Sequence, residues 1–181
     1  QASSSAASDV YKRQGLRESE NWVQLLETSL KLSGNELKII NSSISGDTTI
    51  GGLSRIESYL EEHKPNYVLI ELGGNDALRG YPINKIKSNL LKIIDVSFAA
   101  KANPMIMQIR IPPNYGKNYV KAFESIYTQI AKEKNIPLLT FLLEKVALDK
   151  SLMQLDGIHP NQKAQQIIAN QVEKELSIIL K

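Results

Sequence analysis

Residues 67–76 read Tyr67-Val68-Leu69-Ile70-Glu71-Leu72-Gly73-Gly74-Asn75-Asp76, a nearly continuous apolar run that ends in a polar loop with two glycines. A short apolar run bounded by turn residues is typical of a strand that is covered on both faces of its sheet. Such strands form parallel sheets, whose ligands bind beyond the carboxyl ends of the strands. This stretch therefore predicts an α/β fold and makes the loop after it a candidate site.

Helical and strand patterns alternate on both sides of this run, from Gly15 to the end of the chain. Further strands are predicted at 37–40, 105–109 and 137–141, and helices at 19–33, 53–62, 83–100, 118–134 and 162–180. Strands that are separated by helices imply crossover connections and a parallel sheet with helices on both faces. The predicted fold class is a three-layer α/β domain.

The composition excludes several classes of protein. The chain has 181 residues, which corresponds to about one domain, and it contains no cysteine, which excludes disulfides and thiolate chemistry. Its net charge of +3 is spread along the chain, so no nucleic-acid partner is expected. No apolar run approaches about 18 residues, so no stable membrane insertion is expected. No His, Asp or Glu cluster has metal-ligand spacing, and we predict no metal and no cofactor.

The first fourteen residues differ from the rest of the chain. Residues 1–8 contain only Gln, Ala and Ser, and they lack the apolar core of a secretory signal. We expect residues 1–14 to be a foreign or disordered segment, in which the true start of the protein was lost, and residues 15–181 to be the folded domain.

Two loops at the predicted sheet edge and one late turn could carry chemistry. Asp156 precedes His159 by three residues, so its carboxylate could hold the imidazole in one tautomer and leave the other nitrogen free as a base. The alternative is turn chemistry, with Asp156-Gly157 as the turn and Pro160 near a helix start. Asn75 could donate to a developing oxyanion, or it could cap the next helix. Gly46 offers a backbone N–H beside Asp47, or it is a simple loop glycine.

Glu71 interrupts an otherwise apolar strand and would need a partner if it were buried. Arg110 follows a later strand and is the candidate partner. A structural ion pair is the favoured interpretation of these two residues.

Several blocks of the sequence resemble the SGNH (GDSL-type) hydrolases, and in particular the bacterial thioesterase I, lysophospholipase and arylesterase subgroup. The blocks follow the family's order and cover nearly the whole chain from Gly15. They are Ile44-Ser45-Gly46-Asp47-Thr48, Glu71-Leu72-Gly73-Gly74-Asn75-Asp76, Leu78-Arg79-Gly80, Met107-Gln108-Ile109-Arg110, Asn114-Tyr115-Gly116 and Asp156-Gly157-Ile158-His159-Pro160.

The resemblance implies a flavodoxin-like α/β/α SGNH hydrolase fold and acyl transfer to water through a serine ester. By this resemblance, Asp156 orients His159, and His159 is the general base and later the general acid. Gly46 and Asn75 would form the oxyanion hole. The residues expected to line the acyl groove are Gly74, Asp76, Leu78, Tyr81, Ile111 and Tyr115. The implied substrate is a small acyl ester or thioester, and the implied protein is a monomer that is periplasmic or secreted.

The family's first block, Gly-Asp-Ser-Leu at the end of the first strand, is missing from this chain. Counting back from Gly15, its place is taken by Ala7-Ser8-Asp9-Val10, with Asp9 where the serine should be and Ser8 one position early. Because no apolar run precedes this place, we expect the first strand to be lost or replaced and the chain to be inactive. A non-catalytic acyl-binding pseudo-hydrolase and a carbohydrate deacetylase remain as alternatives.

Overall fold

The computed structural model describes residues 2–5, 21–34, 37–44, 46–155 and 160–180. Five parallel strands form one sheet in the order β2-β1-β3-β4-β5, with bounds β1 Ala2–Ser5, β2 Ile39–Asn41, β3 Tyr67–Ile70, β4 Asn103–Met107 and β5 Leu138–Leu139. This is the α/β architecture that the alternation of apolar runs and helices predicts.

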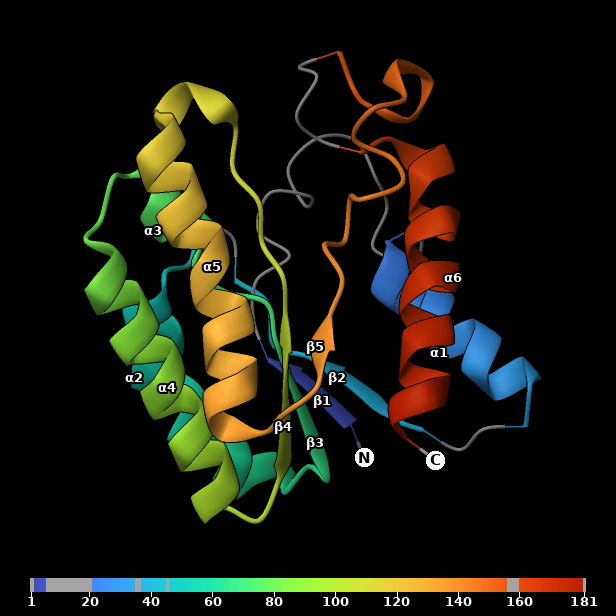
Figure 1. Ribbon diagram of the computed structural model, residues 1–181. Coiled ribbons are helices and arrows are strands. Elements are labelled where there is room, and N and C mark those ends of the chain that lie inside the picture. The colour runs from blue at the N-terminus through green and yellow to red at the C-terminus, as the bar shows by residue number, and fades with distance from the viewer. Residues whose placement is uncertain (1, 6–20, 35–36, 45, 156–159, 181) are drawn as a thin grey trace.

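Helices cover both faces of the sheet (Figure 1). On one face lie α2 (Thr49–His63), α4 (Ile83–Ala99) and α5 (Lys117–Lys134), and on the other lie α1 (Trp22–Leu32) and α6 (Gln162–Ile179). Three short helical turns complete the described chain: α3 (Gly74–Leu78), η2 (Pro113–Tyr115) and η3 (Lys150–Leu152). Across the described ranges, no helix combines the length and the apolar character that crossing a bilayer requires.

The core is divided by the sheet into two clusters, and strand β3 contributes to both. Val68 and Ile70 pack with α2, α4 and α5, whereas Leu69 packs with α1, α6 and the methionines of β4. This alternation is the period of two that a strand imposes on its side chains. It explains why the β3 sequence is apolar at successive positions, since each of its faces is buried.

The structure decides between the two outcomes expected for the first strand. Residues 2–5 form β1, which lies between β2 and β3, with Ser3 opposite Val68 and Ser5 opposite Ile70. Of the two expected outcomes, a lost or a replaced first strand, the structure has the replaced one, because residues 2–5 occupy its place in the sheet. Parallel pairing depends on backbone groups, which Ala and Ser present as well as Val or Ile do. Residues 6–14, including Ser8 and Asp9, lie outside the described residues.

Element boundaries shift by a few residues from the expected ones. Helix α1 is capped by Asn21, whose side chain accepts from the backbone N–H of Gln24 at 2.9 Å. The expected cap Ser19 is outside the described residues. Helix α2 begins four residues earlier than its apolar pattern suggested, at Thr49 after the capping residue Thr48. This early start brings the first turn of α2 to the carboxyl edge of the sheet, beside the candidate site.

Candidate active site

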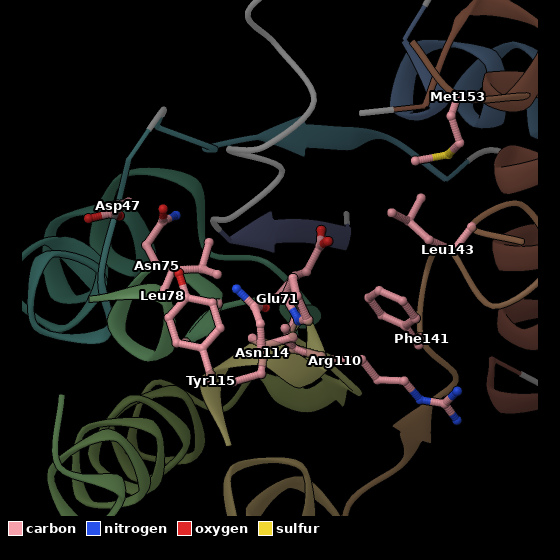
Figure 2. A pocket seen from close by; sticks show the side chains of 16 residues that line it. Asp47, Glu71, Asn75, Leu78, Arg110, Asn114, Tyr115, Phe141, Leu143 and Met153 are labelled. Atoms are coloured by element: carbon pink, nitrogen blue, oxygen red, sulfur yellow. The ribbon is translucent and has the colours of Figure 1, made fainter. Parts of the chain in front are cut away.

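A cavity of about 710 Å³ opens at the carboxyl edge of the sheet (Figure 2). One side is formed by residues that follow β2 and β3, and we call Asp47, Gly73, Gly74 and Asn75 its polar wall. The opposite side is formed by residues that follow β5, and we call Phe141, Leu143, Ala147 and Met153 its apolar wall. Between the walls, the lining consists of Glu71, Leu78, Ile109, Arg110, Ile111, Pro112, Asn114 and Tyr115.

Five of the residues expected to bind substrate or an oxyanion line this cavity. They are Gly74, Asn75, Leu78, Ile111 and Tyr115, and they come from two loops that are far apart in the sequence. The common edge of a parallel sheet brings these loops together, as the position of each loop after its strand predicted. Their roles in binding and chemistry stay predictions.

Three other expected residues are not among the described residues that line the cavity. Asp76 follows Asn75 in helix α3, and a helix turns successive side chains about 100° apart, so the Asp76 carboxylate points away from the cavity and is only 2% exposed. Tyr81 lies beyond α3, where its carbonyl accepts from the Tyr119 hydroxyl at 2.7 Å. Gly46 has a positive φ of 78° and precedes the lining residue Asp47. Asp76 and Tyr81 therefore do not line the groove as expected.

The two residues predicted to form the acid–base pair, Asp156 and His159, lie outside the described residues. The chain on both sides of them is placed at the apolar wall. Met153, which lines the cavity, forms an antiparallel bridge with Pro160. The backbone N–H of Asn161 donates to the Leu152 carbonyl at 2.8 Å, and the Asn161 side-chain amide donates to Ser151 and Met153. The described residues that precede and follow positions 156–159 are thus bridged to each other beside the cavity.

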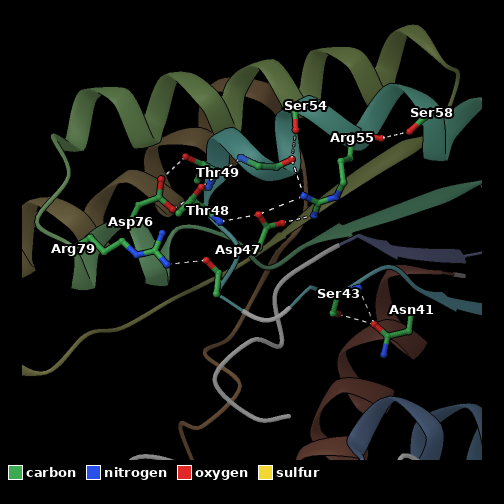
Figure 3. Close-up of polar contacts among 12 residues, drawn as sticks. Asn41, Ser43, Asp47, Thr48, Thr49, Ser54, Arg55, Ser58, Asp76 and Arg79 are labelled. Carbon is green, nitrogen blue, oxygen red and sulfur yellow. Dashed lines mark hydrogen bonds and ion pairs between the residues drawn. The ribbon is translucent and has the colours of Figure 1, made fainter. Parts of the chain in front are cut away.

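An ion pair that the sequence did not indicate supports the polar wall (Figure 3). Asp47 is buried just before α2 and pairs with Arg55, which lies eight residues later in that helix. The Asp47 carboxylate also accepts from the Thr48 N–H at 2.9 Å. The hydrogen bond to Asp47 raises the pKa of Arg55. A Cβ on Gly51 would lie 2.0 Å from Asp47 Oδ1. The adjacent glycines Gly51-Gly52 inside a helix were the available signal for this close approach.

Asp76 joins the polar wall to the helices behind it. Its carboxylate accepts from the Thr49 N–H at 2.9 Å and from the Thr49 hydroxyl at 2.6 Å, and Asn89 of α4 donates to that hydroxyl at 3.0 Å. Burial raises the pKa of Asp76, against the lowering effect of its bonds to Thr49. Arg79 makes a second link by donating to the Gly46 carbonyl at 3.1 Å. The loop before α2 is therefore held directly to the helix that carries Asn75.

Gly73 shapes the turn between β3 and α3. Its φ of 111° lies in the region that favours glycine, and a Cβ there would lie 2.5 Å from the Tyr127 hydroxyl oxygen. That hydroxyl donates to the Leu72 carbonyl at 2.8 Å. A side chain at position 73 would displace this bond, so glycine is required for the turn that presents Asn75.

Glu71 lines the cavity and is only 6% exposed, but the predicted ion pair with Arg110 is wrong. Arg110 instead donates to Glu144 at 3.3 Å, pairs with its second carboxylate oxygen at 3.2 Å, and lies 6.0 Å over the Phe141 ring. Figure 2 shows the guanidinium pointing away from Glu71. A long side chain that begins beyond the strand end can reach solvent, which charge favours. Burial raises the pKa of Glu71 well above its ordinary value.

The comparisons with known proteins agree with this architecture. Residues 4–167 match the GDSL-like lipase/acylhydrolase family. Thioesterase 1/protease 1/lysophospholipase L1 of Escherichia coli K12 is 47% identical over 142 residues, which cover 78% of this chain and 68% of that protein. The arylesterase of Vibrio mimicus is 46% identical over 157 residues, which cover 87% of this chain and 78% of the arylesterase.

A solved structure matches the fold over almost the whole chain. The psychrotrophic esterase EstA from Pseudoalteromonas sp. has a TM-score of 0.94 and 39% identity, and the match covers 99% of both chains. Its extent shows that the parallel sheet and both helical layers are shared with an esterase of known structure. With an apolar cavity at the sheet edge and a family match over most of its length, this chain belongs to the GDSL-like lipase/acylhydrolase family, the SGNH hydrolases.

Proposed function

We propose that this chain carries the site of an acyl ester or thioester hydrolase of the acyl-CoA thioesterase, lysophospholipase or arylesterase type. The observation that carries the proposal is the cavity of about 710 Å³, in which apolar side chains meet the amide of Asn75. The apolar lining suits an acyl chain, and the polar wall suits the carbonyl at its end. The named activities of the related proteins support this substrate class.

The proposed mechanism is acyl transfer through a serine ester. A serine hydroxyl attacks the carbonyl while His159 takes its proton, and Asp156 holds the imidazole in orientation. The Gly46 N–H and the Asn75 amide donate to the oxyanion that forms on the carbonyl oxygen. His159 then gives the proton to the leaving alcohol or thiol, and water hydrolyses the acyl-serine by the same steps. Met153 lines the cavity and forms a bridge with Pro160, and this position of the residues on either side of 156–159 supports the assignment.

The nucleophile distinguishes this chain from an active member of the family. Because Asp9 occupies the expected serine position, we propose that the chain as it stands hydrolyses esters only at the background rate. The combined substitutions Ala7→Gly, Ser8→Asp, Asp9→Ser and Val10→Leu restore the missing block after the central strand β1. We expect this variant to hydrolyse p-nitrophenyl butyrate on the order of 100-fold faster than the unaltered chain.

The matched control is the same variant with His159→Ala, which should return to the background rate. Turnover by the unaltered chain that disappears on Ser8→Ala would contradict the proposal, because it would make Ser8 the nucleophile. A restored variant that is folded by circular dichroism, binds acyl ligands and still lacks turnover would favour the second candidate, a non-catalytic acyl-binding protein. The observation behind that candidate is an intact cavity in a chain with Asp9 at the serine position.

A carbohydrate deacetylase of the same superfamily is the less favoured alternative. The apolar wall offers Phe141, Leu143, Ala147 and Met153, which suit hydrocarbon better than the hydroxyls of a sugar. Hydrolysis of octanoyl thioesters in preference to acetylated sugars by the restored variant would exclude it. The family resemblance also predicts a monomer in the periplasm or outside the cell, which sedimentation and fractionation of source cells would test.

A further inference from the structure

The carboxyl group of Glu71 has no role in the mechanism above, although it lies in the wall of the same cavity. Glu71 follows Leu69 by two residues, so its side chain leaves the strand on the α1–α6 face, where the apolar wall also lies. Figure 2 shows the carboxyl oxygens directed into the space between Leu78 and Leu143. The group is thus set apart from Asn75 and faces the part of the cavity that suits an acyl chain.

No described residue hydrogen-bonds to the Glu71 carboxyl group, and its expected partner Arg110 turns to Glu144. A buried carboxyl without a partner is costly for folding, and a leucine of similar size would fill the same place without that cost. Because Glu71 lies in the lining of a cavity, a ligand can reach its carboxyl group and form the hydrogen bond that the protein does not supply.

Burial favours the neutral form of this side chain, because it penalises the charged form. A neutral carboxylic acid has one O–H donor in addition to its acceptor oxygens. In an apolar cavity, such a donor is complementary to an uncharged acceptor oxygen of a ligand that carries no hydrogen, such as an ester or ether oxygen. Once ionised, the group is an acceptor only and repels those oxygens.

We propose that Glu71 forms a hydrogen-bonding subsite in the cavity, where its carboxyl O–H donates to an uncharged oxygen of an acyl ligand. The subsite selects uncharged acyl ligands that carry an ester or ether oxygen beside the apolar wall over plain hydrocarbons. The inference rests on the proposed function, since it assumes that the cavity binds acyl ligands. It goes further by naming the class of ligand and the residue that recognises it.

Other charged and titratable groups near this subsite are already paired or belong to the proposed mechanism. Among the described residues, Asp47 is paired with Arg55, and Arg110 with Glu144. Tyr115 lines the cavity, and Tyr127 donates to the Leu72 carbonyl behind it. Asp156 and His159 also titrate, and a Glu71→Gln variant retains both. The difference between wild type and Glu71→Gln therefore isolates the contribution of Glu71 to any pH dependence.

The test is calorimetric binding of dibutyl ether, an uncharged ether that has no hydroxyl group and cannot be hydrolysed, to the full chain at pH 5.5 and pH 9. We expect the wild type to bind roughly three- to tenfold tighter at pH 5.5, which is the range of one neutral hydrogen bond. Glu71→Gln, which keeps a donor without titrating, should bind with the same affinity at both pH values. Glu71→Leu should bind weakly at both.

Butylbenzene, which has no oxygen, is the control ligand and should bind to Glu71→Leu at least as well as to the wild type. If butylbenzene binds but dibutyl ether binds equally to the wild type and Glu71→Leu, the subsite is overturned and the proposed function stands. If neither ligand binds to any of the three proteins, the acyl cavity itself is overturned, and the proposed function with it.

Discussion

The two walls of the cavity differ in how they are held. Behind the polar wall, hydrogen bonds and an ion pair join Asp47 to Arg55, Asp76 to Thr49, and Arg79 to Gly46. The side chains of the apolar wall are held by packing, since Leu143 and Val146 are buried while Leu148 is 94% exposed. Hydrogen bonds from Asn161 and Gln171 reach only its backbone, at the carbonyls of Met153 and Phe141. Fixed donors are needed where charge develops in a reaction, whereas hydrocarbon contacts are non-directional and tolerate small displacements. The cavity therefore combines a rigid side for the reacting group with an adaptable side for the chain attached to it.

The strongest way to break the polar wall is to remove the carboxylate of Asp76. Asp76→Ala leaves the N–H and the hydroxyl of Thr49 without their acceptor in a buried site, and we expect a loss of about 2–4 kcal/mol in the free energy of unfolding. Urea unfolding measures it. The matched control, Asp95→Ala, removes an exposed partner of Lys134 and should cost less than about 0.5 kcal/mol. Equal losses of unfolding free energy in Asp76→Ala and Asp95→Ala would contradict the view that the buried hydrogen bonds of Asp76 hold the polar wall.

A second substitution tests how closely the polar wall is packed. Gly51→Ala places a methyl group against Asp47 Oδ1, which is pinned by Arg55 and Thr48, and should cost about 1–3 kcal/mol. In an Asp47→Ala background the same change should cost less than about 0.5 kcal/mol, because the obstructing oxygen is gone. Double-mutant unfolding measures this coupling. Additive effects would show that Gly51 is required for another reason.

A third substitution tests the lining between the two walls, where Glu71 is buried and no described residue hydrogen-bonds to its carboxyl group. Its raised folded pKa means that its contribution to stability is fully present below the unfolded value of about 4.3 and is lost as the pH rises through the folded value. Glu71→Leu should therefore be more stable than the wild type by about 1–2 kcal/mol at pH 8, and by less at pH 4. Urea midpoints at the two pH values check this, and a gain that does not change with pH would contradict it.

The smallest effect is expected on the outer side of the apolar wall. Leu148→Ser changes a side chain that is almost fully exposed, so the free energy of unfolding should change by less than about 0.5 kcal/mol. Val146→Ser is the matched control, since Val146 is fully buried two residues earlier and its replacement should cost about 2 kcal/mol or more. A large loss of unfolding free energy on Leu148→Ser would mean that the Leu148 side chain is buried against other residues in solution.

Most of the fold could be predicted from the sequence, because apolar periodicity records which faces are buried. The long helices α4, α5 and α6 match their predicted spans to within about a residue, and β3 was predicted from its doubly buried sequence. Strand β1 was not predicted, because Ala2–Ser5 have no apolar pattern and the strand depends on backbone pairing with its neighbours. A central strand of this composition thus cannot be predicted from the pattern of apolar side chains.

The candidate site was predicted in part. Its loops were located by topology, since each follows a strand of one parallel sheet. The Glu71–Arg110 pair was predicted wrongly, because the sequence gives the position of a long side chain but not its direction. The Asp47–Arg55 pair was missed, because an acid and a base eight residues apart carry no signal until the helix start at Thr49 is known. Direction and local backbone path decide such contacts, and both depend on tertiary packing.

The two adjacent glycines of α2 have a consequence for how tolerance to mutation is interpreted. A Cβ on Gly51 would meet Asp47, and one on Gly52 would lie 2.4 Å from Leu72 Cδ1. Neither glycine is proposed to touch a substrate. In a complete survey of single substitutions made in the variant with the restored serine block, these positions should be almost as intolerant as Asn75, so intolerance alone would not separate catalysis from packing. Only a measurement that compares folded protein with turnover can tell them apart.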